Sequence, residues 1–449
     1  MCKSNLLRCV LEQIDIIIKM GEDAMRILIK NGRVINPATG TDEVLDLLIE
    51  DKKVIKMEAG IAEEAERIVD ATGCFVMPGF IDLHVHFRDP GLEHKETIET
   101  GSKAAAAGGY TTVFAMPNTK PVADNADVVN YVHNKAKEVG LTNVSQVGAI
   151  TKGQAGAELA DIEEMAKAGI ITISEDGKSV MNSQLYREAM EIAAKLGLTV
   201  LAHCEDINLV NGGVVNADVH TTELGLSGIT NSVEDVIVAR DIMLSRDTGA
   251  KLHLCHCSTK DSVTMVKMAK DEGLRVTAEV CPHHFVLTSE DIKDPEDTNY
   301  KMNPPLRTRE DVDALIAGLR DDIMDVIATD HAPHAFEEKN TNMKKAPFGI
   351  VGIETVAALT YSELVKPGIL SPMQMAEKMS YNPAKVVGID KGDIQPGKVA
   401  DIVIFNPNET YKIDKNEFLS KGKNTPFHGR EVTGRVCMTI MDGNIAYER

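Results

Sequence analysis

Two histidines, His84 and His86, stand two residues apart in the apolar stretch 80–87, and Arg88 follows after the same interval. The stretch has the character of a β-strand, in which residues i and i+2 project from the same face. Neutral imidazole is the commonest metal ligand in proteins, so this pair could bind one metal ion. The guanidinium of Arg88 could bind a carboxylate through two parallel hydrogen bonds. A single His-x-His is more often incidental, so further ligands must come from elsewhere in the chain.

Other side chains that could bind a metal ion or transfer a proton stand at the ends of other apolar runs. Asp176 belongs to an acidic turn that ends in Gly177, and His203, His256 and Asp330 each follow a run of strand-like residues. Each also has a plain structural explanation, such as an Asp-Gly turn, a hydrogen-bonded core histidine or a helix cap. The choice therefore depends on whether the fold brings these ends together.

The elements that carry these residues alternate along the middle of the chain. Short β-branched runs are separated by longer helical stretches, which indicates parallel strands with right-handed crossovers. The candidate strands cover residues 80–86, 111–116, 143–150, 169–175, 198–204, 251–257, 274–281 and 324–329. Eight such strands predict an α/β fold, a (β/α)₈ TIM-like barrel, whose chemistry lies at the C-terminal ends of the strands. The candidate ligands fall at those ends, and this convergence favours a functional site.

The two ends of the chain are β-rich and differ from this middle part. The pair Asn31-Gly32 between two apolar runs predicts a two-residue hairpin turn, and Asp442-Gly443 predicts another near the C-terminus. We expect both ends to fold together into one small β-sandwich domain. The predicted organisation is an amphipathic, dispensable extension at 1–24, β-sandwich parts at 25–77 and 395–449, and the barrel at 78–394.

Composition limits the classes of partner. The chain has 449 residues, with 48 Lys and Arg against 68 Asp and Glu, a formal charge of −20. This balance argues against a nucleic-acid or anionic-membrane surface, and no run reaches the roughly 18 apolar residues of a spanning helix. The eight cysteines are sparse, which predicts reduced thiols and a cytoplasmic location. Cys255 and Cys257 flank His256, but their spacing favours buried thiols over zinc ligands.

Four stretches resemble dihydroorotases of the bacterial class I type, within the amidohydrolase superfamily. They are Pro-Gly-Phe-Ile-Asp-Leu-His-Val-His-Phe-Arg-Asp-Pro-Gly at 78–91, Met-Pro-Asn-Thr at 116–119, Ala-His-Cys-Glu-Asp at 202–206 and Thr-Asp-His-Ala-Pro-His at 329–334. The similarity extends over essentially all of the chain from Met25 onward.

The resemblance implies two zinc ions per subunit. One would be bound by His84, His86 and Asp330, the other by His203 and His256, with Asp176 and a hydroxide bridging them. Related hydantoinases and allantoinases bridge their two metal ions with a carboxylated lysine. The acidic turn in this chain therefore favours dihydroorotase over those relatives. The family commonly has Asp-Asp-Gly there, where this chain has Glu175-Asp176-Gly177. His253 competes with His256 for the ligand role, and strand alternation with the His-Cys-Ser-Thr context favours His256.

The resemblance also implies a substrate and a reaction. Arg88, Asn118 and His334 resemble the groups that hold the dihydroorotate carboxylate, while Asn303 and the backbone of Phe348 and Gly349 resemble contacts to the ring. The implied activity is the zinc-dependent, reversible hydrolysis of (S)-dihydroorotate to N-carbamoyl-L-aspartate, the ring closure of de novo pyrimidine biosynthesis run in reverse. Asp330 would act as base and then as acid. Residues 334–347 form either a solvated loop or a mobile lid.

Two alternatives stay open at this point. A dihydropyrimidinase or allantoinase would share the barrel, but should lack the clamp of Arg88 and Asn118 and possess a bridging lysine. A non-catalytic scaffold for aspartate carbamoyltransferase would have lost metal-binding histidines that this chain retains. We expect a small-molecule substrate, no nucleic acid, no membrane and a homodimer, and association with aspartate carbamoyltransferase is an open question.

Overall fold

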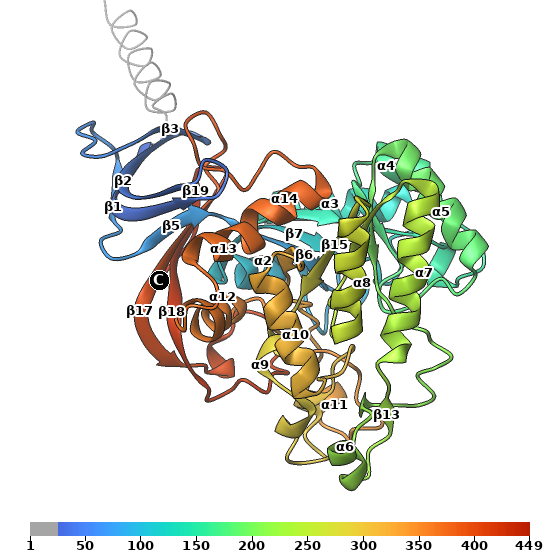
Figure 1. Ribbon diagram of the computed structural model, residues 1–449. Coiled ribbons are helices and arrows are strands. Elements are labelled where there is room, and N and C mark those ends of the chain that lie inside the picture. The colour runs from blue at the N-terminus through green and yellow to red at the C-terminus, as the bar shows by residue number, and fades with distance from the viewer. Residues whose placement is uncertain (1–25) are drawn as a thin grey trace, which may run out of the picture.

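The computed structural model describes residues 26–449, so the predicted extension at 1–24 lies outside the described residues. Both ends of the described chain contribute to one β-sheet, with strand order β19-β18-β17-β5-β1-β2-β3 and β4 paired to β1. Figure 1 shows the blue N-terminal strands beside the red C-terminal ones. The two halves meet where β5 and β17 pair antiparallel, with Phe75 opposite Phe405. The strands are β1 (Arg26–Asn36), β2 (Thr41–Glu50), β3 (Lys53–Glu58), β4 (Arg67–Asp70), β5 (Phe75–Pro78), β17 (Ile402–Lys412), β18 (Glu431–Met441) and β19 (Asn444–Glu448).

The prediction of a hairpin turn at Asn31-Gly32 was wrong. Strand β1 continues through the pair, with a register shift against β2 between Ile29 and Gly32. Asn31 adopts a φ of 60°, and its N–H donates to Oδ1 of Asp46 at 2.9 Å. A bulge and a tight hairpin turn both use the left-handed conformation that Asn tolerates, so the pair alone cannot distinguish them. The Asp442-Gly443 turn does join β18 to β19, as predicted.

Parallel strands in the middle of the chain close into a (β/α)₈ barrel, which confirms the predicted fold class. The closure is a parallel bridge between Val85 and His331, where the N–H of His86 donates to the carbonyl of His331 at 2.9 Å. Each strand overlaps its predicted range, and the third is divided into β8 and β9 at Val147. The strands are β6 (Phe80–Val85), β7 (Tyr110–Ala115), β8 (Asn143–Gln146), β9 (Gly148–Ala149), β10 (Thr172–Ser174), β11 (Thr199–Ala202), β14 (Lys251–Leu254), β15 (Val276–Val280) and β16 (Val326–Ile327).

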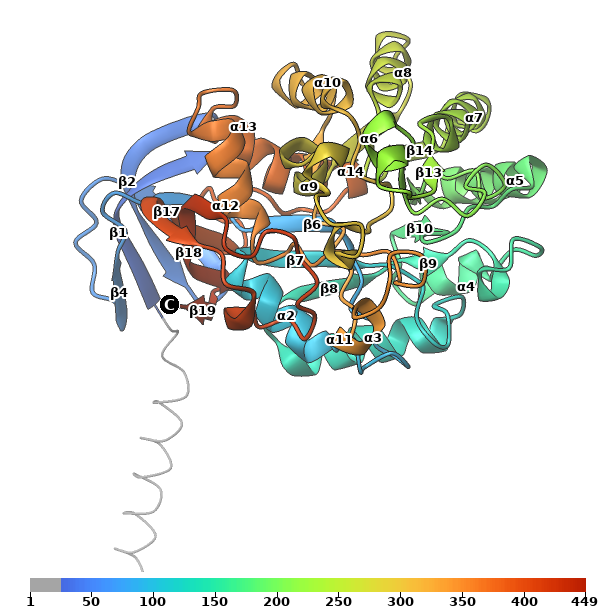
Figure 2. The ribbon, with the colours of Figure 1, turned by 90° about the horizontal axis from the view of Figure 1, so that it is seen from below.

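Helices surround the strands, and Figure 2 shows α10, α8, α7 and α5 in an arc outside them. Local sequence fixes several helix ends: the side chains of Asn125 and Asn182 cap α3 and α5, while Gly140 and Gly197 end them with φ of 65° and 74°. The helices are α2 (Ile98–Ala107), α3 (Ala126–Val139), α4 (Ile162–Lys167), α5 (Ser183–Leu196), α7 (Ser232–Thr248), α8 (Lys260–Asp271), α10 (Arg309–Arg320), α12 (Val356–Thr360), α13 (Pro372–Ala376) and α14 (Asn382–Val387). None of the helices within residues 26–449 is both long enough and apolar enough to cross a bilayer.

Strand burial explains why polar residues on the barrel must find partners. Every residue of β6, β7 and β11 is buried, as expected for parallel strands covered on both faces. Asp82 and His84 on β6 are fully buried. A buried polar side chain without a partner is unfavourable, so such residues are matched with partners from neighbouring strands or serve a ligand.

Shorter elements lie at the C-terminal ends of the barrel strands. A segment with β12 (Val215–Asn216), α6 (Val219–Glu223) and β13 (Gly228–Ile229) follows β11, and α9 (Pro282–Val286) and α11 (Phe336–Lys339) follow β15 and β16. Figure 1 places α6, β13 and α11 at the same end of the molecule. The buried guanidinium of Arg307 donates to Oδ1 of Asn216 and to the carbonyl of Ile229, both at 3.0 Å. This arginine therefore fixes the segment to the barrel.

Residues 413–430, between β17 and β18, leave the terminal sheet and reach the barrel; we call them the crossing segment. The N–H of Val351 donates to the carbonyl of Asn424 at 2.9 Å, and the hydroxyl of Ser420 donates to Glu96 at 2.5 Å. The C-terminal part of the chain thus contacts the face of the barrel that carries the polar strand ends.

Candidate active site

A cavity of about 350 Å³ opens at the C-terminal ends of the barrel strands. All residues that the sequence assigned to the site line it, except His84, which is fully buried. The lining residues are His86, Arg88, Asn118, Asp176, Gly177, His203, Glu205, His256, Asn303, Asp330, Ala332, His334, Phe348 and Gly349. Residues spread over more than 260 positions of sequence are therefore gathered in one place.

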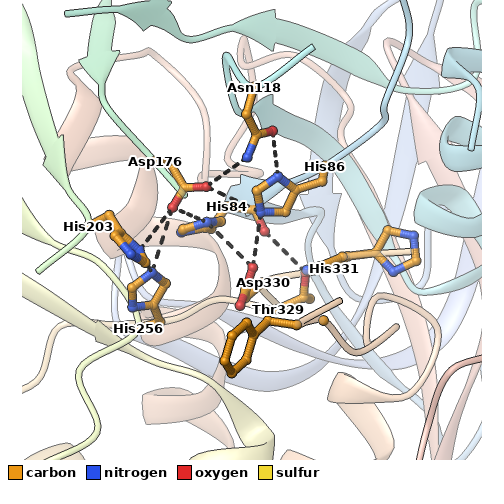
Figure 3. Close-up of polar contacts among 12 residues, drawn as sticks. His84, His86, Asn118, Asp176, His203, His256, Thr329, Asp330 and His331 are labelled. Carbon is orange, nitrogen blue, oxygen red and sulfur yellow. Dashed lines mark hydrogen bonds and ion pairs between the residues drawn. The ribbon is translucent and has the colours of Figure 1, made fainter. Parts of the chain in front are cut away.

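The carboxylate of Asp176 lies at the centre of four imidazoles (Figure 3). Its Oδ1 is 3.2 Å from Nε2 of His84, 3.4 Å from Nδ1 of His203 and 3.7 Å from Nε2 of His256. Its Oδ2 is 3.5 Å from Nε2 of His86. Asp176 thus faces both of the histidine pairs that the sequence assigned to separate metal ions.

A second carboxylate, Asp330, lies on the side of His84 and His86. Its Oδ1 is 3.1 Å from Nε2 of His86 and 3.5 Å from Nε2 of His84. Burial opposes the charged form, yet the hydrogen bond from His86 and the nearby imidazoles hold the pKa of Asp330 well below its usual range. Burial likewise acts to raise the pKa of Asp176, but the nearby imidazoles, with His84 the strongest, lower it by more, so the net shift is downward. Both side chains are therefore carboxylates at neutral pH.

The donor atoms fit a metal centre. Nε2 of His84 is buried and has no hydrogen-bond partner within the described part of the chain, although it faces two carboxylates. Nδ1 of His203 and Nε2 of His256 face one another at 2.9 Å, an arrangement in which two lone pairs can be directed at a cation. Imidazole nitrogens and carboxylate oxygens are ligands that zinc accepts. Of the four groups of side chains within residues 26–449 that could each hold one ion, two line this site: His84 with His86 and Asp330, and His84 with Asp176 and His256.

The outer nitrogens of the first two histidines are occupied by acceptors. Nδ1 of His84 contacts Oε1 of Glu279 at 3.1 Å, and Nδ1 of His86 contacts Oδ1 of Asn118 at 3.0 Å. A carboxylate or carbonyl oxygen accepts the proton of that nitrogen, which leaves the Nε2 lone pair free for a metal. Asn118 therefore orients His86, in addition to the carboxylate-binding role that the sequence suggested.

Sequence reasoning did not identify Glu279 and Glu205. Glu279 is fully buried and also accepts from Nε2 of His253 at 2.9 Å, so His253 is directed to this glutamate and His256 lines the cavity. Glu205 lines the cavity, with Oε2 3.1 Å from Nε2 of His203 and Oε1 accepting from Asn303 at 2.9 Å. The sequence did contain signals for both residues. Glu279 is a charged residue inside an apolar strand, and Glu205 stands two residues after the candidate ligand His203.

The departure from Asp-Asp-Gly at 175–177 has a local explanation. The Glu175 carboxylate accepts hydrogen bonds from the N–H of Thr151, at 3.0 Å, and from its hydroxyl. Glutamate is longer than the aspartate common in the family, and the Glu175 side chain reaches Thr151 in the loop after β9. Asp176 keeps its position among the imidazoles.

Arg88 is buried at the wall of the cavity. Among residues 26–449 no acidic side chain forms an ion pair with it, and its Nε donates to the carbonyl of Pro333 at 3.3 Å. The neighbouring Asp89 is engaged by Lys135 at 2.7 Å and by the hydroxyl of Tyr131 at 3.0 Å, so its carboxylate is directed to these two residues and not to Arg88. Burial lowers the pKa of Arg88 to about 10, so it remains a cation at neutral pH.

Three of the cavity residues have left-handed backbone conformations. Arg88, His256 and Asp330 have φ of 61°, 35° and 46°. For a residue other than glycine this conformation costs roughly 1–2 kcal/mol, and such outliers cluster at functional sites. The backbone here is shaped to direct side chains into the cavity.

His334 is neutral and both of its ring nitrogens have partners. Its Nε2 donates to the carbonyl of Phe348 at 2.8 Å, and the ammonium of Lys95 lies 3.4 Å from its Nδ1. Burial, Arg88 and Lys95 lower the pKa of His334 to about 2. The N–H of Gly349 is also engaged, by the carbonyl of Lys301 at 3.0 Å. The backbone groups that the sequence assigned to ring contacts are thus largely occupied.

Comparisons with known proteins place this geometry in a family. A family profile described as Dihydro-orotase-like matches residues 73–262. A dihydroorotase of Acetivibrio thermocellus is 48% identical, over 93% of this chain and 98% of the relative. One of Pelotomaculum thermopropionicum is also 48% identical, over 94% and 99%, and one of Geobacter metallireducens is 47% identical, over 95% and 100%.

Solved structures show the same fold. An L-hydantoinase (dihydropyrimidinase) from Arthrobacter aurescens superimposes with a TM-score of 0.84 at 27% identity, covering 94% of this chain and 96% of that one. A D-hydantoinase from a Bacillus species gives a TM-score of 0.82 at 25% identity, covering 94% and 95%. The cavity of polar strand ends therefore lies in an amidohydrolase barrel. Since relatives nearly half identical match this chain along almost their whole length, the chain belongs to the dihydroorotase family.

Proposed function

We propose that this protein is a dihydroorotase, which reversibly hydrolyses (S)-dihydroorotate to N-carbamoyl-L-aspartate and, in the opposite direction, closes the ring in de novo pyrimidine biosynthesis. The observation that carries the proposal is Arg88, a buried arginine with no acidic partner among residues 26–449, in the same cavity as the donor atoms grouped around Asp176. This pairing of an anion-binding cation with a metal-type donor set suits a cyclic amide that bears a carboxylate.

The proposed metal content is two zinc ions per subunit. His84, His86 and Asp330 would hold one and His203 and His256 the other, while Asp176, which faces both sets of histidines, would contribute its carboxylate to both. Zinc at such a site polarises a carbonyl and lowers the pKa of water towards neutrality.

The chain's own residues would then bind the substrate and move one proton. Arg88 and Asn118 would hold the carboxylate, with His334 beside them, while Asn303, Phe348 and Gly349 would face the ring. Water attacks the ring amide carbonyl and the carbon–nitrogen bond breaks. Asp330 would take a proton from the water and deliver it to the departing ring nitrogen, acting as base and then as acid.

The alternative cyclic amide hydrolases are less well supported. According to the family resemblance, hydantoinases and allantoinases bridge their metals with a carboxylated lysine. Among the described residues, no lysine lines this cavity, and Asp176 occupies the central position. A scaffold role without catalysis is also disfavoured, because the histidines and carboxylates converge on the cavity.

Three finer points are proposals as well. The cysteines at 74, 204, 255, 257, 281 and 437 are free thiols, which supports a reducing, cytoplasmic setting. A homodimer is expected from the family resemblance. The family resemblance also suggests association with aspartate carbamoyltransferase. Co-elution of the two purified proteins on size-exclusion chromatography would test it.

The experiment for the proposed function is a substrate panel. Zinc-loaded protein should cyclise N-carbamoyl-L-aspartate and hydrolyse dihydroorotate, and should act at least about 100-fold less efficiently on dihydrouracil, hydantoin and allantoin, which lack the carboxylate. Chelation should abolish the activity and added zinc should restore it. Equal or better turnover of dihydrouracil would replace the proposal with a dihydropyrimidinase.

A further inference from the structure

Two side chains from separate parts of the chain donate to one backbone carbonyl at the wall of the cavity. Nζ of Lys339 lies 3.2 Å from the carbonyl oxygen of Gly349, and Nδ2 of Asn424 lies 3.1 Å from the same atom. Lys339 ends the short helix α11, whereas Asn424 belongs to the crossing segment. Nothing in the proposed chemistry uses either residue directly, so their convergence needs another explanation.

Lys339 is a buried lysine whose Nζ, among the described residues, contacts backbone carbonyl groups only. The residue is only 6% exposed. Its Nζ also donates to the carbonyls of Lys301 and Pro347, both at 3.1 Å. Within the described part of the chain, no carboxylate lies within ion-pair distance of it. Burying an amino group away from water is unfavourable unless it is hydrogen-bonded, and the three carbonyls supply those bonds.

Asn424 joins two loops that line the cavity. Its Nδ2 donates to the carbonyl of Ala332 at 3.1 Å as well as to Gly349, and its Oδ1 accepts from the N–H of His334 at 3.1 Å. The residue is 4% exposed. The three hydrogen bonds of this side-chain amide thus all go to backbone groups of residues that line the cavity.

The unit held in this way is Phe348 and Gly349. The carbonyl of Phe348 accepts from Nε2 of His334 at 2.8 Å, and the ammonium of Lys301 lies 4.5 Å from the centre of the Phe348 ring. Gly349 has a φ of +150°, and a Cβ there would lie 2.7 Å from the carbonyl oxygen of Ala332 and 2.8 Å from Cδ2 of His334. These loops are packed too closely for Gly349 to move alone, so a shift of Gly349 must also move His334 and Phe348.

We propose that Lys339 and Asn424 are positioning residues, which hold the Gly349 carbonyl and thereby fix His334 and Phe348 at the substrate side of the cavity. The inference rests on the proposed function for the identity of the substrate. It assigns to the crossing segment, and so to the C-terminal part of the terminal sheet, a role in substrate binding.

The expected kinetic effect is on substrate binding more than on turnover. The substitutions Lys339→Met and Asn424→Asp each remove donors to the Gly349 carbonyl, and the aspartate also places an acceptor against it. The wall would loosen while the donor atoms around Asp176 stay in place. We expect KM for dihydroorotate to rise about tenfold with kcat changed less than about threefold. Because both residues act on one carbonyl, the double variant should raise KM by less than the product of the single effects.

The matched control is another buried lysine. Lys378 is fully buried and donates to Oδ1 of Asp322 at 2.9 Å and to the carbonyl of Met324 at 3.0 Å, ahead of β16 and away from the cavity. Lys378→Met should lower the thermal midpoint and leave KM unchanged. A KM effect in Lys339→Met but not in Lys378→Met separates positioning from general loss of stability.

Hydrogen–deuterium exchange of the zinc-loaded full chain supplies a readout that needs no substrate. Peptides that cover residues 344–351 should exchange faster in Lys339→Met and Asn424→Asp, and should be unchanged in Lys378→Met. If Lys339→Met does not accumulate as folded protein, Asn424→Asp decides. Unchanged KM and unchanged exchange in the positioning variants overturn the inference. If the wild type does not turn over dihydroorotate, the proposed function fails, and the exchange result alone supports or overturns the positioning role.

Discussion

Oδ1 of Asp176 lies 3.2 Å from Nε2 of His84, where His84 belongs to barrel strand β6 and Asp176 stands two residues after barrel strand β10. His84 is fixed at the end of β6, with its outer nitrogen against the buried carboxylate of Glu279. Asp176 follows β10, where the side chain of Glu175 is directed to Thr151. The relationship is therefore set by the barrel itself, and the site does not require large rearrangement to assemble its donor atoms.

Replacing the proposed proton carrier should remove turnover without unfolding the protein. Asp330→Asn keeps the shape of the side chain but cannot accept and return a proton. We expect kcat to fall by about 10³-fold or more, within the range that general acid–base groups supply. The check is steady-state kinetics in both directions on protein whose metal content and circular dichroism match the wild type. Normal turnover by such a sample would refute the role of Asp330.

The arginine at the cavity wall should govern recognition of the carboxylate. Arg88→Met removes a charge-assisted contact of about 1.5–3 kcal/mol, which corresponds to a rise in KM of about 10–150-fold. Arg88→Lys keeps the charge but loses the planar fork, so it should restore only part of the affinity. Measured KM values for dihydroorotate decide the matter. Equal KM in wild type and Arg88→Met would show that the carboxylate binds elsewhere.

Glu279 should act on the metal through His84. Glu279→Gln replaces the acceptor with an amide that can present either a carbonyl or an amino group to the imidazole, so the tautomer of His84 is no longer fixed. Loss of such a partner typically weakens metal binding 10–100-fold. Competition with a chelator, followed by metal analysis, measures this without any assay of turnover. An unchanged zinc affinity would mean that His84 is oriented by packing alone.

Lys339 should make stability depend on pH above neutrality. Burial, and then the nearby Lys301, lowers the pKa of Lys339 to about 7, while Asp297 opposes the shift. A lysine in the unfolded chain titrates near 10.4. Between about pH 7 and 10 the unfolded chain therefore binds a proton that the folded chain lacks, so the stability contribution of Lys339 rises with pH and is weakest below pH 7.

The comparison that tests this is chemical denaturation of wild type and Lys339→Met at several pH values. The difference in unfolding free energy should shift in favour of the wild type by about 3–4 kcal/mol between pH 7 and pH 10. Lys378→Met serves as the control. A difference that stays constant over this range would contradict the lowered pKa.

The barrel and most of the cavity lining could be predicted from the sequence because their signals are local. Apolar runs mark the strands; His84 and His86 lie at the end of one such run, and Asp330 stands directly after another. A barrel gathers strand ends in one place, so these local positions were sufficient to group the residues. Their roles in metal binding and catalysis are proposals that the experiments above test.

The residues that the sequence did not single out act through distant partners. Asn424 is 75 and 92 positions from the carbonyls to which it donates, and Lys339 lies in a stretch rich in Lys, Asn and Glu that resembles a solvated loop. Only burial in the folded chain distinguishes these two from ordinary surface residues. Asn31 shows the same limit on a smaller scale, since its left-handed preference suits a bulge as well as a turn.

The pairing of β5 with β17 has a consequence for synthesis of the protein. During translation β1 to β5 emerge before the barrel strands, and the strand that covers the free side of β5 is made only after the entire barrel. The early strands must therefore remain with an uncovered edge, which is a site for wrong pairing between nascent chains. Since the crossing segment also follows β17, the cavity wall at Gly349 is completed late, and a ribosome-bound chain that has a folded barrel would still lack a finished binding site.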